Sequence, residues 1–141
     1  MIRRANATDC DAVRVLMEQM EWHPFDPDEF REFYVKVLAA PHYLMWVYED
    51  EGKVVGFATL MIKTPIHHLR TTGEIVEIAV HEDYRNRGIG SQLLTLLHDY
   101  ARENGLSKIE ANSKKIRVDA HRFYYRHGYE ALRNTLTLEF E

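Results

Sequence analysis

The feature that most constrains this chain lies in residues 74–100, where a strand, a glycine turn and a helix are predicted in direct succession. The strand is indicated by an apolar, largely β-branched run over residues 75–80. Five apolar residues then recur at three- and four-residue steps, as on one face of a helix: Ile89, Leu93, Leu96, Leu97 and Tyr100. Between the strand and the helix lie Gly88 and Gly90. The first turn of a helix has unpaired N–H groups and the positive end of the helix dipole, so this arrangement predicts a phosphate-binding turn.

Composition limits the class of protein. The 141 residues are enough for one domain with a substantial core, and 45% hydrophobic and 28% charged residues are typical of a globular protein. A net charge of −4 argues against nucleic acid as a partner and favours a cationic or small-molecule substrate. The one cysteine, Cys10, excludes an intrachain disulfide and favours a reducing compartment. No apolar run approaches the ~18 residues of a membrane helix, so we expect no membrane partner and a cytoplasmic location.

The other helices and strands are predicted from hydrophobic periodicity and from the glycine and proline residues that interrupt it. No linker or internal repeat interrupts the chain, which predicts a single domain over residues 1–141. The order of elements mixes hairpins with two β-α-β crossovers. It therefore predicts the α/β class in its α+β form, with a mixed, mostly antiparallel sheet and about four helices on both faces. We expect helices near residues 12–20, 28–40, 89–103 and 119–127, and strands over residues 1–5, 43–48, 54–62, 74–80, 108–112, 129–132 and 135–140.

Three phosphate ligands compete for the glycine turn. An ATP or GTP loop is excluded because the turn lacks the Gly-Lys-Ser/Thr ending. A dinucleotide fold is favoured by Gly88-x-Gly90 and by Glu110, twenty residues further on. However, Leu93 occupies the third glycine position, and the preceding strand belongs to an antiparallel series. The third alternative uses the arginines, because residues 85–90 fit the pattern Arg/Gln-x-x-Gly-x-Gly/Ala.

Three further motifs accompany this pattern in a fixed order, and together they span nearly the whole chain. They are Ile2-Arg3-x-Ala5 with Asp9-x-x-Ala12-Val13-x-x-Leu16, Gly52-Lys53-Val54-Val55-Gly56, and Ala120-x-x-Phe123-Tyr124-x-x-x-Gly128-Tyr129. With these motifs the chain resembles the GCN5-related N-acetyltransferase family. The resemblance implies an acetyl-coenzyme A-dependent acyltransferase. Without the other motifs, the arginines would be read as solvated surface charges and Gly88 as a residue that permits a tight turn.

The resemblance assigns a cofactor site. Backbone N–H groups from Arg87 to Ser91 would hold the pyrophosphate of acetyl-coenzyme A, and the strand carrying Ile78 would pair with the pantetheine arm. In the family this strand splays from the next one, and the cofactor lies in the cleft between them. The residues so assigned are Ile78, Ala79, Val80, Arg85, Arg87, Gly88, Ile89, Gly90, Ser91 and Asn112.

Two residues are candidates for proton transfer. Glu77 is a carboxylate in the middle of an apolar strand, and strand alternation predicts that it shares a face with Ile75 and Ala79. The family often carries a glutamate base on this strand, whereas the alternative for Glu77 is a solvated residue or an arginine partner. Tyr124 stands at the tyrosine of Phe-Tyr-x-x-x-Gly, whose hydroxyl approaches the cofactor sulfur in the family. Its alternative is a core aromatic residue. No enzyme nucleophile is needed, because an amine can attack the thioester directly.

The acceptor side is predicted from an aromatic loop and a histidine-containing connection. The residues expected to line it are Trp22, Phe25, His67, His68 and Arg70. The two histidines, with Glu77 nearby in the fold, raise a metal site as a minority alternative. It is disfavoured because adjacent residues on a strand point to opposite faces, so that both histidines would not bind one ion. His67-His68-Leu69 and the segment 119–124 resemble aminoalkylphosphonate N-acetyltransferases, in which case Arg70, Lys63 or Arg117 would meet a phosphonate. An aminoglycoside, a polyamine or a protein amine fits the net acidity better, and the sequence leaves the acceptor open.

The resulting prediction is transfer of an acetyl group to a primary amine of a small molecule. The alternatives are a non-catalytic module that binds acyl-coenzyme A and the acetylation of a protein amine. Dimers are common in the family, and the closing strands would offer an edge for a homodimer, which the sequence does not decide.

Overall fold

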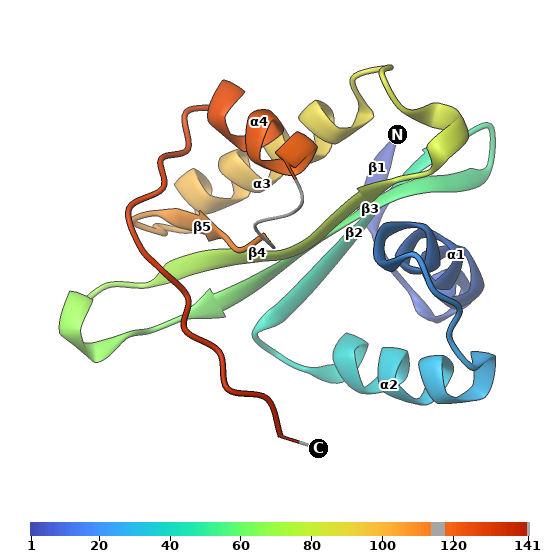
Figure 1. The fold of residues 1–141 in the computed structure, drawn as a ribbon, viewed down its shortest axis with the longest axis horizontal. Helices are drawn as coiled ribbons and strands as arrows, with labels where there is room; N and C mark the ends of the chain where they lie inside the picture. The colour runs from blue at the N-terminus through green and yellow to red at the C-terminus, as the bar shows by residue number, and fades with distance from the viewer. Residues whose placement is uncertain (114–117, 141) are drawn as a thin grey trace. The chain divides into compact units, whose positions relative to one another are not determined.

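A five-stranded sheet organises the computed structural model, which describes residues 1–113 and 118–140 (Figure 1). Strands β1 to β4 pair antiparallel in sequence order. At the far edge, Gly73 N–H donates to Lys108 O and Ser107 N–H donates to Thr71 O, so β5 runs parallel to β4. The predicted mixed, mostly antiparallel sheet is confirmed. Its strands are β1 (Ile2–Arg4), β2 (Tyr43–Asp50), β3 (Lys53–Lys63), β4 (Thr72–Val80) and β5 (Ile109–Ala111).

Within the described residues, four α-helices complete the predicted α/β architecture. They are α1 (Cys10–Glu21), α2 (Pro27–Ala39), α3 (Ile89–Glu103) and α4 (Val118–Arg126), joined by the short 3-10 helices η1 (Ala7–Asp9), η2 (Ile66–His68) and η3 (Glu82–Tyr84). Helix α2 begins one residue earlier than predicted, because the Asp26 side chain caps the Glu29 N–H at 2.9 Å and proline fits the first helical position. Among the described residues, no helix has the length and apolar character needed to cross a membrane.

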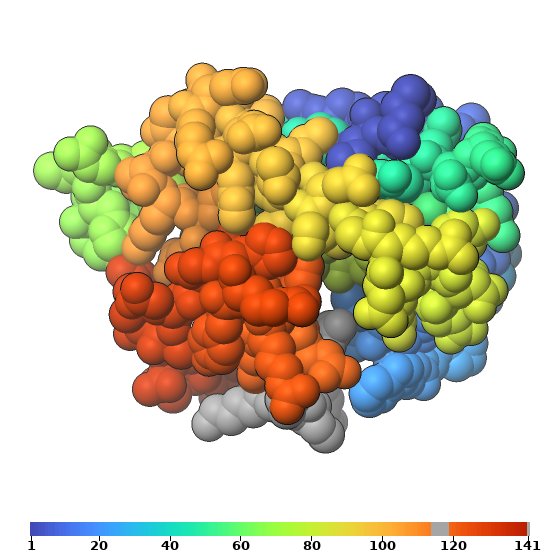
Figure 2. All heavy atoms as spheres, turned by 90° about the horizontal axis from the view of Figure 1, so that it is seen from above, coloured from blue at the N-terminus to red at the C-terminus, as the bar shows by residue number. Residues whose placement is uncertain are grey.

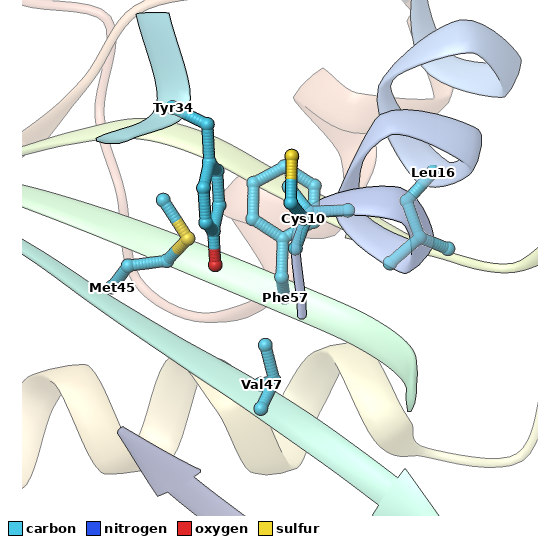
Figure 3. Packing of buried hydrophobic residues seen from close by; sticks show 7 residues of the cluster. Cys10, Leu16, Tyr34, Met45, Val47 and Phe57 are labelled. Carbon is cyan, nitrogen blue, oxygen red and sulfur yellow. The ribbon is translucent and has the colours of Figure 1, made fainter. Parts of the chain in front are cut away.

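The chain divides into two compact units, Met1–Glu110 and Ala111–Glu141, and each is described by itself. In the first unit, α1 and α2 cover one face of the sheet and α3 covers the other (Figure 1). Figure 3 shows the core under α1 and α2, where Cys10 and Tyr34 pack against Phe57 of β3. Cys10 is 2% exposed and acts as a core residue. On the other face, a Cβ on Gly56 would lie 3.2 Å from Ile89 Cγ2, so this glycine lets α3 approach β3 closely.

One ion-pair network that sequence reasoning missed fastens β1 to its neighbours. The Arg3 guanidinium donates twice to the Asp9 carboxylate, at 2.8 Å each, and also bonds to Glu49 Oε1 at 2.6 and 2.8 Å. Asp9 is 4% exposed and also accepts the Asn6 N–H at 2.8 Å. The hydrogen bonds from Arg3 are the main cause that lowers the pKa of Asp9. Residues 2–9 are thus held to β2 by a charge network as well as by the strand ladder.

A β-bulge interrupts β4 halfway along its length. Leu60 pairs with Ile75 and Ala58 pairs with Ile78, so Thr59 alone lies opposite two residues of β4. The extra residue puts Ile75 and Ile78 on the same face, although they are three positions apart. The expectation that Glu77 shares a face with Ile75 is therefore wrong: Glu77 lies with Thr59, whereas Ile75 pairs with Leu60.

In the second unit, the predicted last helix is confirmed as α4. It ends as the sequence predicts, because Gly128 has a φ of +89° and the Tyr129 N–H reaches back to Tyr124 O at 3.1 Å. The two closing strands predicted over residues 129–132 and 135–140 are wrong, since no strand forms over residues 129–140. Alternating apolar residues favour a strand only when a neighbouring strand pairs with the backbone. Instead, Leu136 is 93% and Phe140 87% exposed.

Candidate active site

The turn between β4 and α3 takes the shape that an anion-binding turn requires. The backbone enters the left-handed region at Asn86, with φ +63°, and again at Gly88, with φ +80°. Gly88 is the residue before the first turn of α3, and a Cβ there would meet no atom within 4 Å. The glycine is therefore needed for its backbone angle, and the space over it is open.

The N–H groups of this turn are available to a ligand. The first hydrogen bond of α3 runs from Gln92 N–H to Gly88 O at 3.0 Å. Within the part of the chain that the structure describes, no acceptor is recorded for the backbone N–H groups from Arg87 to Ser91. Five free donors at the positive end of a 15-residue helix fit a pyrophosphate. These are the donors that the sequence predicted for acetyl-coenzyme A.

Two basic side chains lie over the ring of Tyr84, just before this turn. The Arg87 guanidinium lies 4.9 Å from the centre of the Tyr84 ring, and Lys53 Nζ lies 5.9 Å from it. Arg85 Nε donates to Val80 O at 3.3 Å. Figure 2 shows the turn (yellow) at the surface beside the first turns of α3. Tyr84 and Lys53 were not predicted as site residues. The sequence around a lysine in a hairpin does not indicate which distant turn it will contact.

The far end of β4 has a free edge for a cofactor arm. β5 is three residues long, and its recorded bonds place its start beside Gly73. Since the two strands run parallel, β5 ends before it reaches Ile78 to Val80. In the described residues no strand flanks that part of β4 on the side away from β3. This edge is where the sequence predicted pairing with pantetheine.

Glu77 is held by two hydroxyl groups at the bulge. Tyr43 Oη donates to Glu77 Oε1 at 2.6 Å, and Thr59 Oγ1 makes a short hydrogen bond with the same oxygen. The Glu77 backbone N–H donates to Thr59 Oγ1 at 2.8 Å. Burial, followed by the hydrogen bond to Glu77, raises the pKa of Tyr43 far above its usual value, so this phenol stays a donor. Sequence reasoning missed both residues; the signal was a lone hydroxyl, Thr59, within the apolar strand β3.

Tyr124 and Asn112 lie in the second unit. Tyr124 is partly buried on α4, with its ring 5.5 Å from Phe123 and 5.2 Å from Tyr129. Asn112 is exposed and accepts a hydrogen bond from Thr135 Oγ1 at 3.1 Å. Their predicted roles with the cofactor sulfur and with pantetheine remain predictions.

The aromatic residues predicted to line the acceptor side differ in their surroundings. Trp22 ends α1 in the left-handed conformation and is 82% exposed. Phe25 packs edge-on against His23 at 4.7 Å and against Phe30 of α2 at 5.6 Å. Phe25 is thus anchored on α2, and Trp22 is the exposed aromatic residue of this loop.

The two histidines lie close together, contrary to the expectation. His67 and His68 lie in a 3-10 helix, not in extended backbone, and their rings are 4.1 Å apart. The argument that strand alternation separates them is therefore wrong. His68 Nε2 lies 3.3 Å from Lys108 Nζ. Among the described residues no group of three His, Cys, Asp or Glu side chains gathers as a metal site.

The cations proposed for a phosphonate lie in different surroundings. Arg70 is exposed, and Lys63 Nζ forms an ion pair with Glu74 Oε1 at 3.0 Å. Arg117 lies outside the described residues. A separate open groove of about 650 Å³ runs along α3 beside Ile2 and Trp46, and Ser91 is the one predicted site residue that lines it.

Comparison with known proteins identifies the family of the chain. The model of the acetyltransferase (GNAT) family matches residues 11–129. The chain is 34% identical to an aminoalkylphosphonate N-acetyltransferase of Salmonella typhimurium over 92% of its length and 84% of that protein. It is 27% identical to a glucosamine 6-phosphate N-acetyltransferase of Trypanosoma brucei brucei over 67% of its length, spanning 63% of that relative.

Solved structures share the architecture of this chain. The crystal structure of a transcriptional regulator from Bacillus halodurans matches with a TM-score of 0.90 and 22% identity, over 99% of both chains. At this identity the likeness shows the fold alone. Together with the family match, these findings show that the chain is an acyltransferase of the GNAT family, whose acetyl donor is acetyl-coenzyme A.

Proposed function

We propose that this enzyme transfers an acetyl group to the primary amine of a small molecule by direct attack of the amine on the thioester. The observation that supports the proposal is that β4 carries Glu77 and leads directly into the glycine turn before α3. Its Glu77 lies three residues before Val80, and its continuation forms the turn of free N–H groups before α3. A base on the strand and an anion site at its end would place acceptor and donor side by side.

The chemistry requires two proton transfers. With a pKa near 10.4, only on the order of one alkylamine in a thousand is uncharged at pH 7. Glu77 would take one proton from the ammonium and release it to solvent, and the nitrogen of the free amine then bonds to the acetyl carbon as the carbon–sulfur bond breaks. The second N–H proton, lost as the amide forms, balances the proton that the departing thiolate gains. The departing thiolate has a pKa near 8.5, so a hydrogen bond from the Tyr124 hydroxyl would stabilise it and help to return a proton. Bound acetyl-coenzyme A supplies the activated acetyl group.

We further propose that the acceptor is a short aminoalkyl compound with a phosphonate group. Two relatives support this class, because an aminoalkylphosphonate and glucosamine 6-phosphate both combine an amine with a phosphorus oxyanion. The exposed Arg70 and the Lys63 ammonium are cations of the kind that bind such an oxyanion. The phosphonate would hold the compound so that its amine reaches Glu77.

A free-thiol assay with matched amines tests the proposal. The pairs are 2-aminoethylphosphonate with ethylamine, and glucosamine 6-phosphate with glucosamine; spermidine represents polyamines. We expect 2-aminoethylphosphonate to give the highest kcat/KM, and Glu77→Gln to lower it by about 10²- to 10⁴-fold. Equal turnover of ethylamine and 2-aminoethylphosphonate would remove the phosphonate from the proposal. A rise in melting temperature with acetyl-coenzyme A, without turnover of any amine, would favour a binding module instead.

A further inference from the structure

The two oxygens of the Glu77 carboxylate have different surroundings. Oε1 accepts hydrogen bonds from Tyr43 of β2 and Thr59 of β3. For Oε2, no hydrogen-bond partner is recorded among the residues that the structure describes. One oxygen is therefore anchored to the sheet, and the other is available to a ligand.

The hydroxyl protons account for this asymmetry. A hydroxyl group has one proton and two lone pairs. Thr59 Oγ1 accepts the Glu77 N–H at 2.8 Å, so its own proton is free to be donated to Oε1. Tyr43 Oη lies 2.6 Å from Oε1 but 3.4 Å from Thr59 Oγ1, so its proton also goes to Oε1. Both protons are thus used at one carboxylate oxygen.

The bulge explains why a side chain at position 59 holds the backbone of the base. In a regular antiparallel ladder, the N–H of Glu77 would bond to a carbonyl of the neighbouring strand or to solvent. Here Thr59 lies opposite two residues of β4, and its hydroxyl takes that N–H. Thr59 therefore fixes both the backbone and the carboxylate of Glu77. Tyr43 fixes the carboxylate from the adjacent strand.

We propose that Tyr43 and Thr59 are positioning residues, which hold Oε1 of Glu77 so that Oε2 takes the proton from the acceptor amine. The inference rests on the proposed role of Glu77 as the base. Proton transfer needs donor and acceptor atoms within hydrogen-bond distance, and a displacement of about 1 Å can cost on the order of 10²-fold in rate. Loss of either hydroxyl leaves Oε1 with one hydrogen bond and lets the carboxylate rotate more freely, whereas the anion-binding turn before α3 is untouched.

Four single variants test this inference. Thr59→Val and Tyr43→Phe each remove one hydroxyl while keeping the shape of the side chain. We expect both to lower kcat by about 10- to 100-fold with an unchanged KM for acetyl-coenzyme A. Thr59→Ser keeps the oxygen and should recover most of the loss. The matched control is Tyr34→Phe, which removes a buried hydroxyl bonded to Asn6 O at 2.7 Å, and it should keep kcat within about twofold.

A double-mutant cycle with Glu77→Gln separates positioning from structural damage. If Thr59 acts through Glu77, adding Thr59→Val to Glu77→Gln should lower kcat no further. A full additional loss in the double variant would overturn the inference, as would normal kcat in Thr59→Val and Tyr43→Phe beside a strong loss in Glu77→Gln. In that second case the proposed base would stand. Normal kcat in Glu77→Gln would instead remove the base itself, and with it this inference. Melting curves of every variant confirm that folded enzyme is compared.

Discussion

Gly88→Ala tests whether the turn before α3 binds the cofactor through its backbone. Gly88 has a φ of +80° and open space where a Cβ would point. The folded protein should therefore lose only the cost of a left-handed alanine, about 1 kcal/mol. For a chain of this length that corresponds to about 3 °C in melting temperature. A methyl group in the space above the free N–H groups would, however, keep a phosphate from approaching them closely.

Gly105→Ala is the matched control at the other end of the same helix. Gly105 has a φ of +71° and equally open surroundings, so it should lose a similar 1 kcal/mol without touching the turn. At a ligand concentration of about 100 times Kd, acetyl-coenzyme A should stabilise the wild type and Gly105→Ala by about 2.7 kcal/mol. If the methyl group weakens binding about 100-fold, the same concentration stabilises Gly88→Ala by only about 0.4 kcal/mol.

Differential scanning fluorimetry with and without acetyl-coenzyme A measures both effects. The expected result is equal melting temperatures for the two variants without ligand, and a ligand-induced rise that is largely absent from Gly88→Ala alone. An equal ligand-induced rise in both variants would refute binding of the cofactor by the backbone N–H groups of this turn. Isothermal titration calorimetry then gives the Kd values directly.

Three further predictions concern stability and catalysis. Arg3 lowers the pKa of Asp9, so this carboxylate stabilises the fold fully above its unfolded pKa of about 3.9 and progressively less as the pH falls through its native pKa. Asp9→Asn should therefore cost about 2 kcal/mol in urea unfolding at neutral pH, and the difference from wild type should shrink in acid; a pH-independent difference would contradict this. Gly56→Ala would place a Cβ 3.2 Å from α3 and should lower stability by about 1 kcal/mol; an unchanged urea midpoint would show that α3 shifts freely. Tyr124→Phe should lower kcat at least tenfold with its KM values unchanged, whereas Tyr129→Phe, its ring neighbour, should not.

The sequence predicted what local signals determine. Hydrophobic periodicity, together with the glycine and proline residues that interrupt it, was sufficient to predict helices α1 to α4 and strands β1 to β5. Helix caps, hairpin residues and apolar faces each depend on only a few neighbouring residues. The glycine turn before α3 was predictable for the same reason, since Gly88 and the start of α3 are adjacent in the chain, whereas its binding of a phosphate stays a prediction. Residues 129–140 show the limit of this reasoning. Their alternation favours a strand, but the pairing on which a strand depends is a property of another segment.

Non-local geometry accounts for the other differences. The two-residue period of a strand predicted Glu77 on the same face as Ile75. The bulge changes this, and it is not visible within residues 72–80, because it exists only in the pairing with β3. Tyr43 and Thr59 are 34 and 18 positions away from Glu77, so their contact with it was not readable either. Thr59, a lone hydroxyl in the apolar strand β3, was a signal, but such a residue does not identify its partner.

At the bulge, the hydrogen bond that holds the backbone of Glu77 is separate from the backbone ladder that stabilises the sheet. Because the Glu77 amide bonds to the Thr59 hydroxyl, its protection from hydrogen exchange depends on a side chain, unlike a regular ladder amide. Thr59→Val should therefore speed hydrogen exchange at the Glu77 amide. The amide at position 77 would then report small local openings that leave the surrounding strands paired. A change of that one hydroxyl would then alter how Glu77 is held, while the backbone ladder of the five-stranded sheet is kept.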